Sequence, residues 1–302
     1  MTDAIGRTAM PSPYVRRRRL AAEIRKLRES RGLTTDALAQ LMYYSRAKIS
    51  RLENAQGRPD LAEIVSMLNI LEITGSEYDR LHKLAHEAAQ KGWWDKYGVS
   101  MGPRQKLYAD LEYSANSIRD YNQTLMPAVL QAPGFIAALV QLDECQGKLD
   151  YVPERMTEAR MRRQRELLRS DGPSYETVLD ECVIHRLAVP PQAMIAQLHH
   201  MIRVVSEEER ITVRVLLHDA GIPGGFLPMS SFCLYTFAEA GDPPMAVLET
   251  VTTDVVLTQR REVERYATMY DRLRQAALSR EDSLSFLERV ANQLTNESGS
   301  GT

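Results

Sequence analysis

Four residues with the chemistry to read DNA bases recur at helical spacing within SRAKISRLEN, residues 45–54. An arginine presents a fork of donors that fits O6 and N7 of guanine, and an alanine methyl group can contact the methyl group of thymine. If Ile49 and Leu52 are buried, the opposite face of a helix carries Arg46, Ala47, Ser50 and Arg51. These four residues are the candidate base-reading set. The alternative is an ordinary surface helix with solvated arginines.

Three short helices are needed to position this face. Apolar residues recur every three or four positions in 20–31, 34–42 and 45–55, which predicts one helix in each segment. Gly32 can end the first helix, and Ser45 can cap the third. Only Tyr43 and Tyr44 separate the second helix from the third. Two helices joined by so tight a turn predict a helix-turn-helix, whose second helix enters the major groove of DNA.

Several other residues are candidates for contact with DNA phosphates. Thr35 and Ser45 stand at helix starts, where hydroxyl groups and backbone N–H groups suit phosphate oxygens. Lys48 and Asn54 extend this set. The run Arg16, Arg17, Arg18 and Arg19 directly precedes the first helix of the motif and can act as an arm that reaches phosphates or a minor groove. The alternative for this run is the solvated start of a helix.

The segment GLTTDALAQLMYYSRAKISRLENAQGRPD (32–60) resembles the helix-turn-helix of Cro/repressor-type regulators, the XRE family. The family pattern reads GLTQ-x-x-LA-x-x-LG-x-S-x-x-x-IS-x-x-E-x-G. The resemblance implies double-stranded DNA as partner, base reading by the start of the third helix, and an ion pair between Arg28 and Glu53. Two positions depart from the pattern: Tyr43 replaces the turn glycine, and Thr35 replaces a glutamine. A tyrosine is strained if the turn requires a positive φ.

Composition and charge agree with a regulator that touches DNA at one end. The chain has 302 residues and a net charge of −2, but residues 1–91 hold 16 Lys and Arg against 11 Asp and Glu. A basic end suits phosphate, and the remainder is acidic. Three widely separated cysteines fit no zinc spacing and suit a reducing cytoplasm. No apolar run approaches the ~20 residues of a membrane span, so we expect a cytoplasmic protein without membrane, metal or cofactor.

The pattern predicts an α+β protein with a five-helix, all-α N-terminal domain and a mixed α/β C-terminal domain that holds a small sheet. We expect a flexible arm over 1–15, a DNA-binding domain over 16–91, a signal-binding and dimerisation domain over 92–295, and a disordered tail over 296–302. The apolar runs predict strands at 175–184, 211–217, 232–237 and 245–250. Helices are expected at 153–169, 190–205, 262–278 and 282–294. The charges of 153–169 indicate a self-paired solvent face rather than a second nucleic-acid patch.

The C-terminal part also resembles a known domain. WWDKYG (93–98), SIRDYNQTLMPAVLQAPGFIAAL (117–139), VLDECVIHR (178–186) and VERYATMYDRLRQAALSREDSLSFLERVA (263–291) resemble a domain of undefined function in actinobacterial, WhiJ-like regulators. That resemblance implies a second domain that receives a signal, and a small BldB-like protein as a possible partner. DNA-binding proteins of this kind bind two-fold sites as dimers, so we expect a homodimer.

One loop is the first candidate for ligand or partner binding. HDAGIPGGFLPMSS (218–231) lies between two predicted strands, and its candidate residues are His218, Gly221, Gly224, Gly225 and Phe226. A plain surface connection is the alternative. The chain lacks a glycine-rich phosphate loop, a nucleophile elbow and a zinc-hydrolase motif, so we expect no enzyme. The remaining function hypotheses are a regulator controlled by a partner protein, a one-component regulator that senses a small molecule, and a DNA-tethered enzyme.

Overall fold

The computed structural model describes residues 11–149, 151–225, 228–250 and 252–299. These residues form two compact units. Unit 1 holds the described residues up to Lys96 together with Leu107–Ser114 and Glu239–Asp242. Unit 2 holds Tyr97–Lys106, Ala115–Ala238 and the described residues from Pro243 onward. The prediction of an α+β fold is confirmed, since helices dominate unit 1 and the sheet lies in unit 2.

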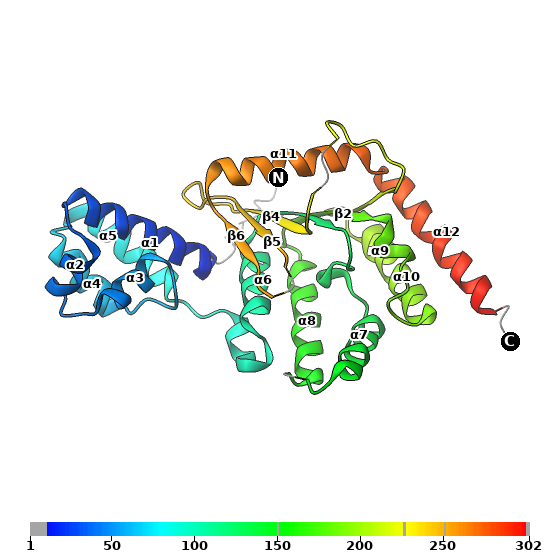
Figure 1. Cartoon of the computed structure of the whole chain (residues 1–302), viewed down its shortest axis with the longest axis horizontal. Helices are drawn as coiled ribbons and strands as arrows, with labels where there is room; N and C mark the ends of the chain where they lie inside the picture. The colour runs from blue at the N-terminus through cyan, green and yellow to red at the C-terminus, as the bar shows by residue number, and fades with distance from the viewer. Residues whose placement is uncertain (1–10, 150, 226–227, 251, 300–302) are drawn as a thin grey trace, which may run out of the picture. The chain divides into compact units, whose positions relative to one another are not determined.

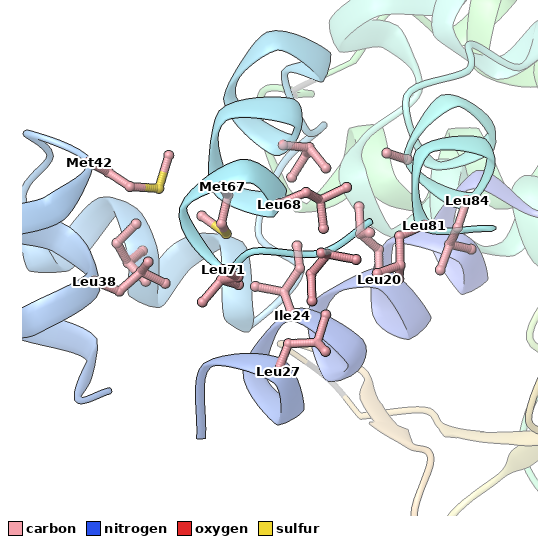
Figure 2. Close-up of a cluster of buried hydrophobic side chains, with 14 of the residues drawn as sticks. Leu20, Ile24, Leu27, Leu38, Met42, Met67, Leu68, Leu71, Leu81 and Leu84 are labelled. Carbon is pink, nitrogen blue, oxygen red and sulfur yellow. The ribbon is translucent and has the colours of Figure 1, made fainter. Parts of the chain in front are cut away.

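Among its described residues, unit 1 contains five α-helices that precede the first tryptophan. They are α1 (Pro13–Ser30), α2 (Thr35–Leu41), α3 (Arg46–Glu53), α4 (Leu61–Ile70) and α5 (Gly75–Ala88). Their apolar residues meet in one core, because each helix presents a face spaced at three or four residues. Figure 2 shows side chains of this core from α1, α2, α4 and α5: Leu20, Ile24, Leu27, Leu38, Met42, Met67, Leu68, Leu71, Leu81 and Leu84.

The start of α1 differs from the predicted flexible arm. Residues 1–10 of that prediction lie outside the described residues, but the helix already begins at Pro13. Ser12 is the N-cap, and its Oγ accepts a hydrogen bond from the Val15 N–H at 3.0 Å. Pro13 favours the first helical position because its φ is preset and it has no N–H to satisfy. The sequence prediction missed this cap and placed the helix start too late.

Unit 2 is built on a six-stranded mixed sheet, as far as the described residues show, with the order β3-β2-β1-β4-β5-β6. β1 (Ser117–Asn122), β2 (Ser174–Asp180) and β3 (Ile211–Leu216) pair in parallel. β4 (Phe232–Thr236), β5 (Met245–Leu248) and β6 (Val255–Leu257) add antiparallel strands from β1 outward. The register pairs Asp120 of β1 with Thr177 of β2 and with Cys233 of β4. Parallel strands need long connections, and helices supply them here.

Helices cover both faces of this sheet. α11 (Arg260–Ala276) packs Val263, Met269, Tyr270 and Leu273 against Tyr121, Val178, Phe232 and Leu234. Figure 1 shows α11 on one side of the sheet, with α7 (Pro133–Gln146), α8 (Pro153–Leu167) and α10 (Pro191–Glu207) on the other. The remaining elements are the short helices η1 (Trp93–Ser100), η2 (Ala128–Leu130) and α9 (Glu181–His185), then α6 (Pro103–Ser114) and α12 (Arg280–Gly299).

Three sequence predictions need correction in this region. The strand expected over 175–184 ends at Asp180, because the Asp180 carboxylate accepts the Cys182 N–H at 3.0 Å and caps α9. The tail expected to be disordered from residue 296 is helical up to Gly299, and the rest of it lies outside the described residues. The central strand β1 and the edge strand β6 were not predicted.

Candidate nucleic-acid interface

Local capping and a buried anchor fix the position of α3. The Ser45 Oγ accepts a hydrogen bond from the Lys48 N–H at 3.3 Å, which satisfies one of the free donors at the helix start. Ile49 is only 1 % exposed and joins the core of unit 1, where Leu52 packs against it. One face of α3 is therefore buried, and the opposite face is available to a ligand.

The structure brings the four predicted base-reading residues to that opposite face. Arg46, Ala47 and Arg51 are exposed, and Ser50 is half-buried. The Arg46 Nε lies 3.7 Å from Asp36 Oδ1, but both side chains are mostly in solvent, so this pair is weak and can yield to a base. The Arg51 side chain forms no hydrogen bond or ion pair with any described residue. Both guanidinium groups are thus available for contact with DNA.

A buried ion pair joins α3 to α1. The Arg28 Nε lies 2.6 Å from Glu53 Oε1, and its Nη2 lies 3.1 Å from Glu53 Oε2, so the contact is bidentate. The two side chains are 9 % and 4 % exposed. The Arg28 Nη1 also donates to the Leu33 carbonyl at 2.7 Å. The hydrogen bond with Glu53 raises the pKa of Arg28, and the bidentate contact holds α3 against α1.

Arg25 belongs to the same network, although the sequence analysis did not single it out. Its Nη2 donates to the Glu53 carbonyl at 3.0 Å and to Asn54 Oδ1 at 3.1 Å. Asn54 in turn donates from Nδ2 to the Ser50 carbonyl at 2.8 Å. The structure therefore places Asn54 at the end of α3 as part of a cap. The signal for Arg25 was its position three residues before Arg28 on the same helix.

Among the predicted phosphate residues, Lys48 has another contact and Thr35 is not the N-cap of α2. Lys48 forms an ion pair with Glu63 of α4, and its Nζ lies 3.7 Å from the centre of the Tyr44 ring. The hydrogen bond with Glu63 raises the pKa of Lys48. Lys48 therefore fastens α3 to α4 and is a poorer phosphate candidate than predicted. Thr35 is the first residue of α2 and is half-buried, whereas the cap is Thr34, whose Oγ1 accepts the Ala37 N–H at 3.1 Å.

The turn between α2 and α3 has the backbone geometry that a glycine would favour. Tyr43 has a φ of 55° and its side chain is 96 % exposed. The Tyr44 N–H donates to the Ala39 carbonyl at 2.9 Å, and the Tyr43 N–H donates to the Gln40 carbonyl at 3.1 Å. This pattern closes α2 in a Schellman motif, which needs a left-handed residue at Tyr43. The tyrosine thus keeps the turn geometry of the motif and carries the strain expected from the sequence.

The run of four arginines is not an arm. Arg16 is 3 % exposed and lies within 3.2 Å of carboxylate oxygens from Glu87, Glu239 and Asp242, all within unit 1. Because its charge is enclosed by three carboxylates, Arg16 is a poor candidate for contact with a phosphate. The carboxylates come from distant parts of the chain, so local sequence gave no signal for them.

The other three arginines of the run are also engaged. Arg17 lies 3.9 Å from Asp110 and Arg19 lies 3.4 Å from Asp242. The Arg18 side chain donates to the Tyr14 hydroxyl at 2.9 Å and stacks over its ring. All three are half-buried, so they hold the first turns of α1 within unit 1 rather than projecting from it.

The candidate loop of unit 2 begins beside a small charged cluster. The His218 Nδ1 and the His218 N–H both lie 2.8 Å from Glu181 Oε2. His185 Nε2 lies 3.3 Å from the other oxygen of Glu181. The hydrogen bond with Glu181 raises the pKa of His218. Gly221, Gly224 and Gly225 follow in the loop, and Phe226 lies outside the described residues.

Within the described ranges, no group of three or more His, Cys, Asp or Glu side chains is arranged to hold a metal ion. In the same part of the chain, no helix has the length and apolar character needed to cross a lipid bilayer.

Comparison with known families identifies two parts of the chain. A family model described as a domain of unknown function (DUF5753) matches residues 105–289, and one described as a helix-turn-helix domain matches residues 19–81. No curated protein and no solved structure matches the chain significantly. The helix-turn-helix match covers α2 and α3 and supports a DNA-binding regulator. The role of the second matched domain is undefined.

Proposed function

Because the chain belongs to the family defined by the domain of unknown function DUF5753, and carries a helix-turn-helix ahead of it, we propose a sequence-specific regulator of transcription. It resembles the XRE type and binds double-stranded DNA through α3. The observation that carries this proposal is the exposed face of Arg46, Ala47, Ser50 and Arg51 on a helix held by the buried Arg28–Glu53 pair. A rigid base-reading helix is what direct readout in a major groove requires.

The contacts divide into base reading and phosphate binding. Arg46 and Arg51 present bidentate donors to guanine, Ala47 contacts a thymine methyl group, and Ser50 accepts or donates a single hydrogen bond. The Ser45 hydroxyl and the first N–H groups of α2 near Thr35 face phosphates. Asn54 adds a phosphate contact at the end of α3. We leave Arg16 and Lys48 out of the proposed set, since each already forms an ion pair with a carboxylate.

The first experiment selects binding sites from a pool of random duplexes with the full chain. A specific reader enriches one motif, and footprinting then maps the protected bases. We expect a two-fold site, with half-sites about one helical turn apart, because proteins of this kind bind as dimers. If the pool stays random after repeated selection, binding is non-specific and the assignment of α3 as a reader is wrong.

We further propose that the protein is a homodimer and that unit 2 supplies the dimer contact. The five short helices of unit 1 bury their apolar faces in their own core, which leaves them little spare apolar surface. Sedimentation of the full chain at micromolar concentration tests this directly. A monomer over that range contradicts the proposal, whereas a dimer that persists when Arg46 and Arg51 are replaced agrees with contact away from α3.

The second domain receives the signal in this proposal, and the candidate signal is a small BldB-like partner protein. What supports it is the resemblance of the C-terminal part to actinobacterial, WhiJ-like regulators. The alternative is a small-molecule ligand, favoured by the cavity that Gly224 lines beside α11. That the protein is not an enzyme and that it is cytoplasmic both stay predictions from the sequence.

A capture experiment separates these two signals. Full chain is used as bait in native cell extract, and the retained proteins and small molecules are identified by mass spectrometry. A small stoichiometric protein that changes the affinity of the chain for its selected site supports a partner. A co-purifying metabolite that changes this affinity supports a ligand sensor and argues against a partner protein as the signal.

A further inference from the structure

Gly224 and helix α11 line a cavity in unit 2. It is lined by Gly224, Arg265, Thr268, Met269 and Arg272, and its volume is about 430 Å³. Sites for small molecules typically have volumes of roughly 300 to 1,000 Å³, so this cavity can hold a small metabolite. Met269 forms an apolar floor, since it is 9 % exposed and belongs to the core beneath α11.

Gly224 is required for this arrangement for two reasons. Its φ is +82°, which an L side chain rarely adopts. A Cβ atom at this position would also lie 2.9 Å from Arg272 Nη1 and 3.2 Å from its Cζ. The guanidinium of Arg272 therefore lies directly against the loop backbone, where any residue larger than glycine would displace it.

Both charged residues of the cavity are arginines, and the described lining contains no carboxylate. Neither the Arg265 side chain nor the Arg272 side chain forms a hydrogen bond or an ion pair with another described residue. The nearby carboxylates are already used: Arg260 binds Glu264 at 2.7 Å, and Arg119 binds Asp271 at 3.1 Å. Among the described residues, the two positive charges of the cavity therefore have no counter-ion.

The spacing of the two arginines limits the ligand. They stand seven positions apart in the sequence, which places them on the same face of α11 about 10 Å apart along its axis. Their long side chains can converge on one molecule from both ends. An arginine fork matches a carboxylate or a phosphate in bidentate geometry. The Thr268 Oγ1 donates to the Glu264 carbonyl at 3.0 Å, so its methyl group and not its proton is available to the ligand.

We propose that this cavity is a binding site for a small dianion, a molecule with two carboxylate or phosphate groups, held between Arg265 and Arg272. The inference deepens the proposed role of unit 2 as a signal receiver, and it gives that signal a chemical class. Binding of the dianion itself does not depend on DNA, because every residue of the site lies in unit 2.

Isothermal titration of the full chain tests the proposal with two probes, inorganic pyrophosphate for the phosphate class and glutarate for the dicarboxylate class. One of them is expected to bind saturably with one site per chain, which also identifies the source of the anion. Replacement of either arginine by alanine should weaken binding by about tenfold or more, since each change removes a hydrogen bond between charged groups. Gly224→Ala should weaken it as well.

Two control variants distinguish this site from general attraction. Arg261 is exposed on the same helix and does not line the cavity, so Arg261→Ala should bind the probe as the unchanged chain does. The proposal is overturned if Arg261→Ala weakens binding of the probe as much as Arg272→Ala does. It is also overturned if neither probe binds saturably. A chain with Arg46→Ala and Arg51→Ala should lose its selected DNA site but keep the dianion. If that variant no longer binds the dianion, the anion binds in unit 1 instead.

Discussion

Replacement of Glu53 by alanine should strongly destabilise unit 1. The change removes both carboxylate oxygens that Arg28 contacts at 2.6 and 3.1 Å, and it leaves the guanidinium buried. Loss of one partner from a buried pair typically costs about 3–5 kcal/mol. The Leu33 carbonyl at 2.7 Å and Glu29 at 3.5 Å still contact Arg28, so we expect a value near the lower limit, about 3 kcal/mol.

Denaturant titration followed by tryptophan fluorescence measures this loss, because Trp93 and Trp94 are the only tryptophans and both lie in unit 1. Asp36→Ala is the matched control. It removes the exposed partner of Arg46, a pair whose side chains are 73 % and 60 % exposed, and should change the free energy of unfolding by less than about 0.5 kcal/mol. If Glu53→Ala costs no more than Asp36→Ala, the pair does not hold α3 in place and the reasoning fails.

Three further predictions follow from single residues of unit 1. Tyr43→Gly should raise the free energy of unfolding by about 0.5–1 kcal/mol, because it relieves a left-handed backbone and loses no packing. Ala55→Gly and Glu72→Gly, at φ 56° and 54°, are the matched variants. A loss of stability in Tyr43→Gly would contradict the claim that Tyr43 is strained. Burial raises the pKa of Asp110 from 3.8 to about 7. This rise remains although the hydrogen bonds from Ser12 and the Tyr14 N–H and the charge of Arg17 lower the pKa. The folded state then binds more protons than the unfolded state between about pH 4 and 7, so stability should fall as pH rises through that window, and Asp110→Asn should flatten the profile. Arg16→Gln should destabilise the chain by about 3 kcal/mol and leave the salt dependence of DNA binding unchanged; a shallower salt slope would restore Arg16 as a phosphate contact.

The helix-turn-helix was predictable because its signals are local. The spacing of Ile49 and Leu52, the Ser45 cap and the short turn each lie within a few residues of the face they position. The Arg28–Glu53 contact came from a resemblance to a family, and the structure brings the two residues together. Tyr43 departs from the family pattern but adopts the left-handed backbone that a turn glycine would favour, so the residue type at this position did not determine the turn.

Contacts between distant segments were not predictable. Arg16 looked like part of a DNA-binding arm, and nothing near it in sequence shows that Glu239 and Asp242 lie beside it. Strand β1 was missed because SIRDYN is polar for a central strand. Its Asp120 is buried, and it accepts hydrogen bonds from the Tyr175 hydroxyl at 2.7 Å and from Cys233 Sγ at 3.2 Å. A buried polar group of this kind is satisfied by neighbouring strands, which no local pattern reveals.

The most direct test of the account is the affinity of Arg46→Ala for the selected duplex and for a scrambled duplex of equal length, measured at one salt concentration. Arg46 lies on the exposed face of α3, so its loss should cost about 1–3 kcal/mol, roughly 5- to 150-fold, on the selected site and much less on the scrambled one. The selectivity of the chain would then fall by nearly that factor. An equal loss on both duplexes would show that Arg46 contacts phosphate, and it would contradict the assignment of this face as the base reader.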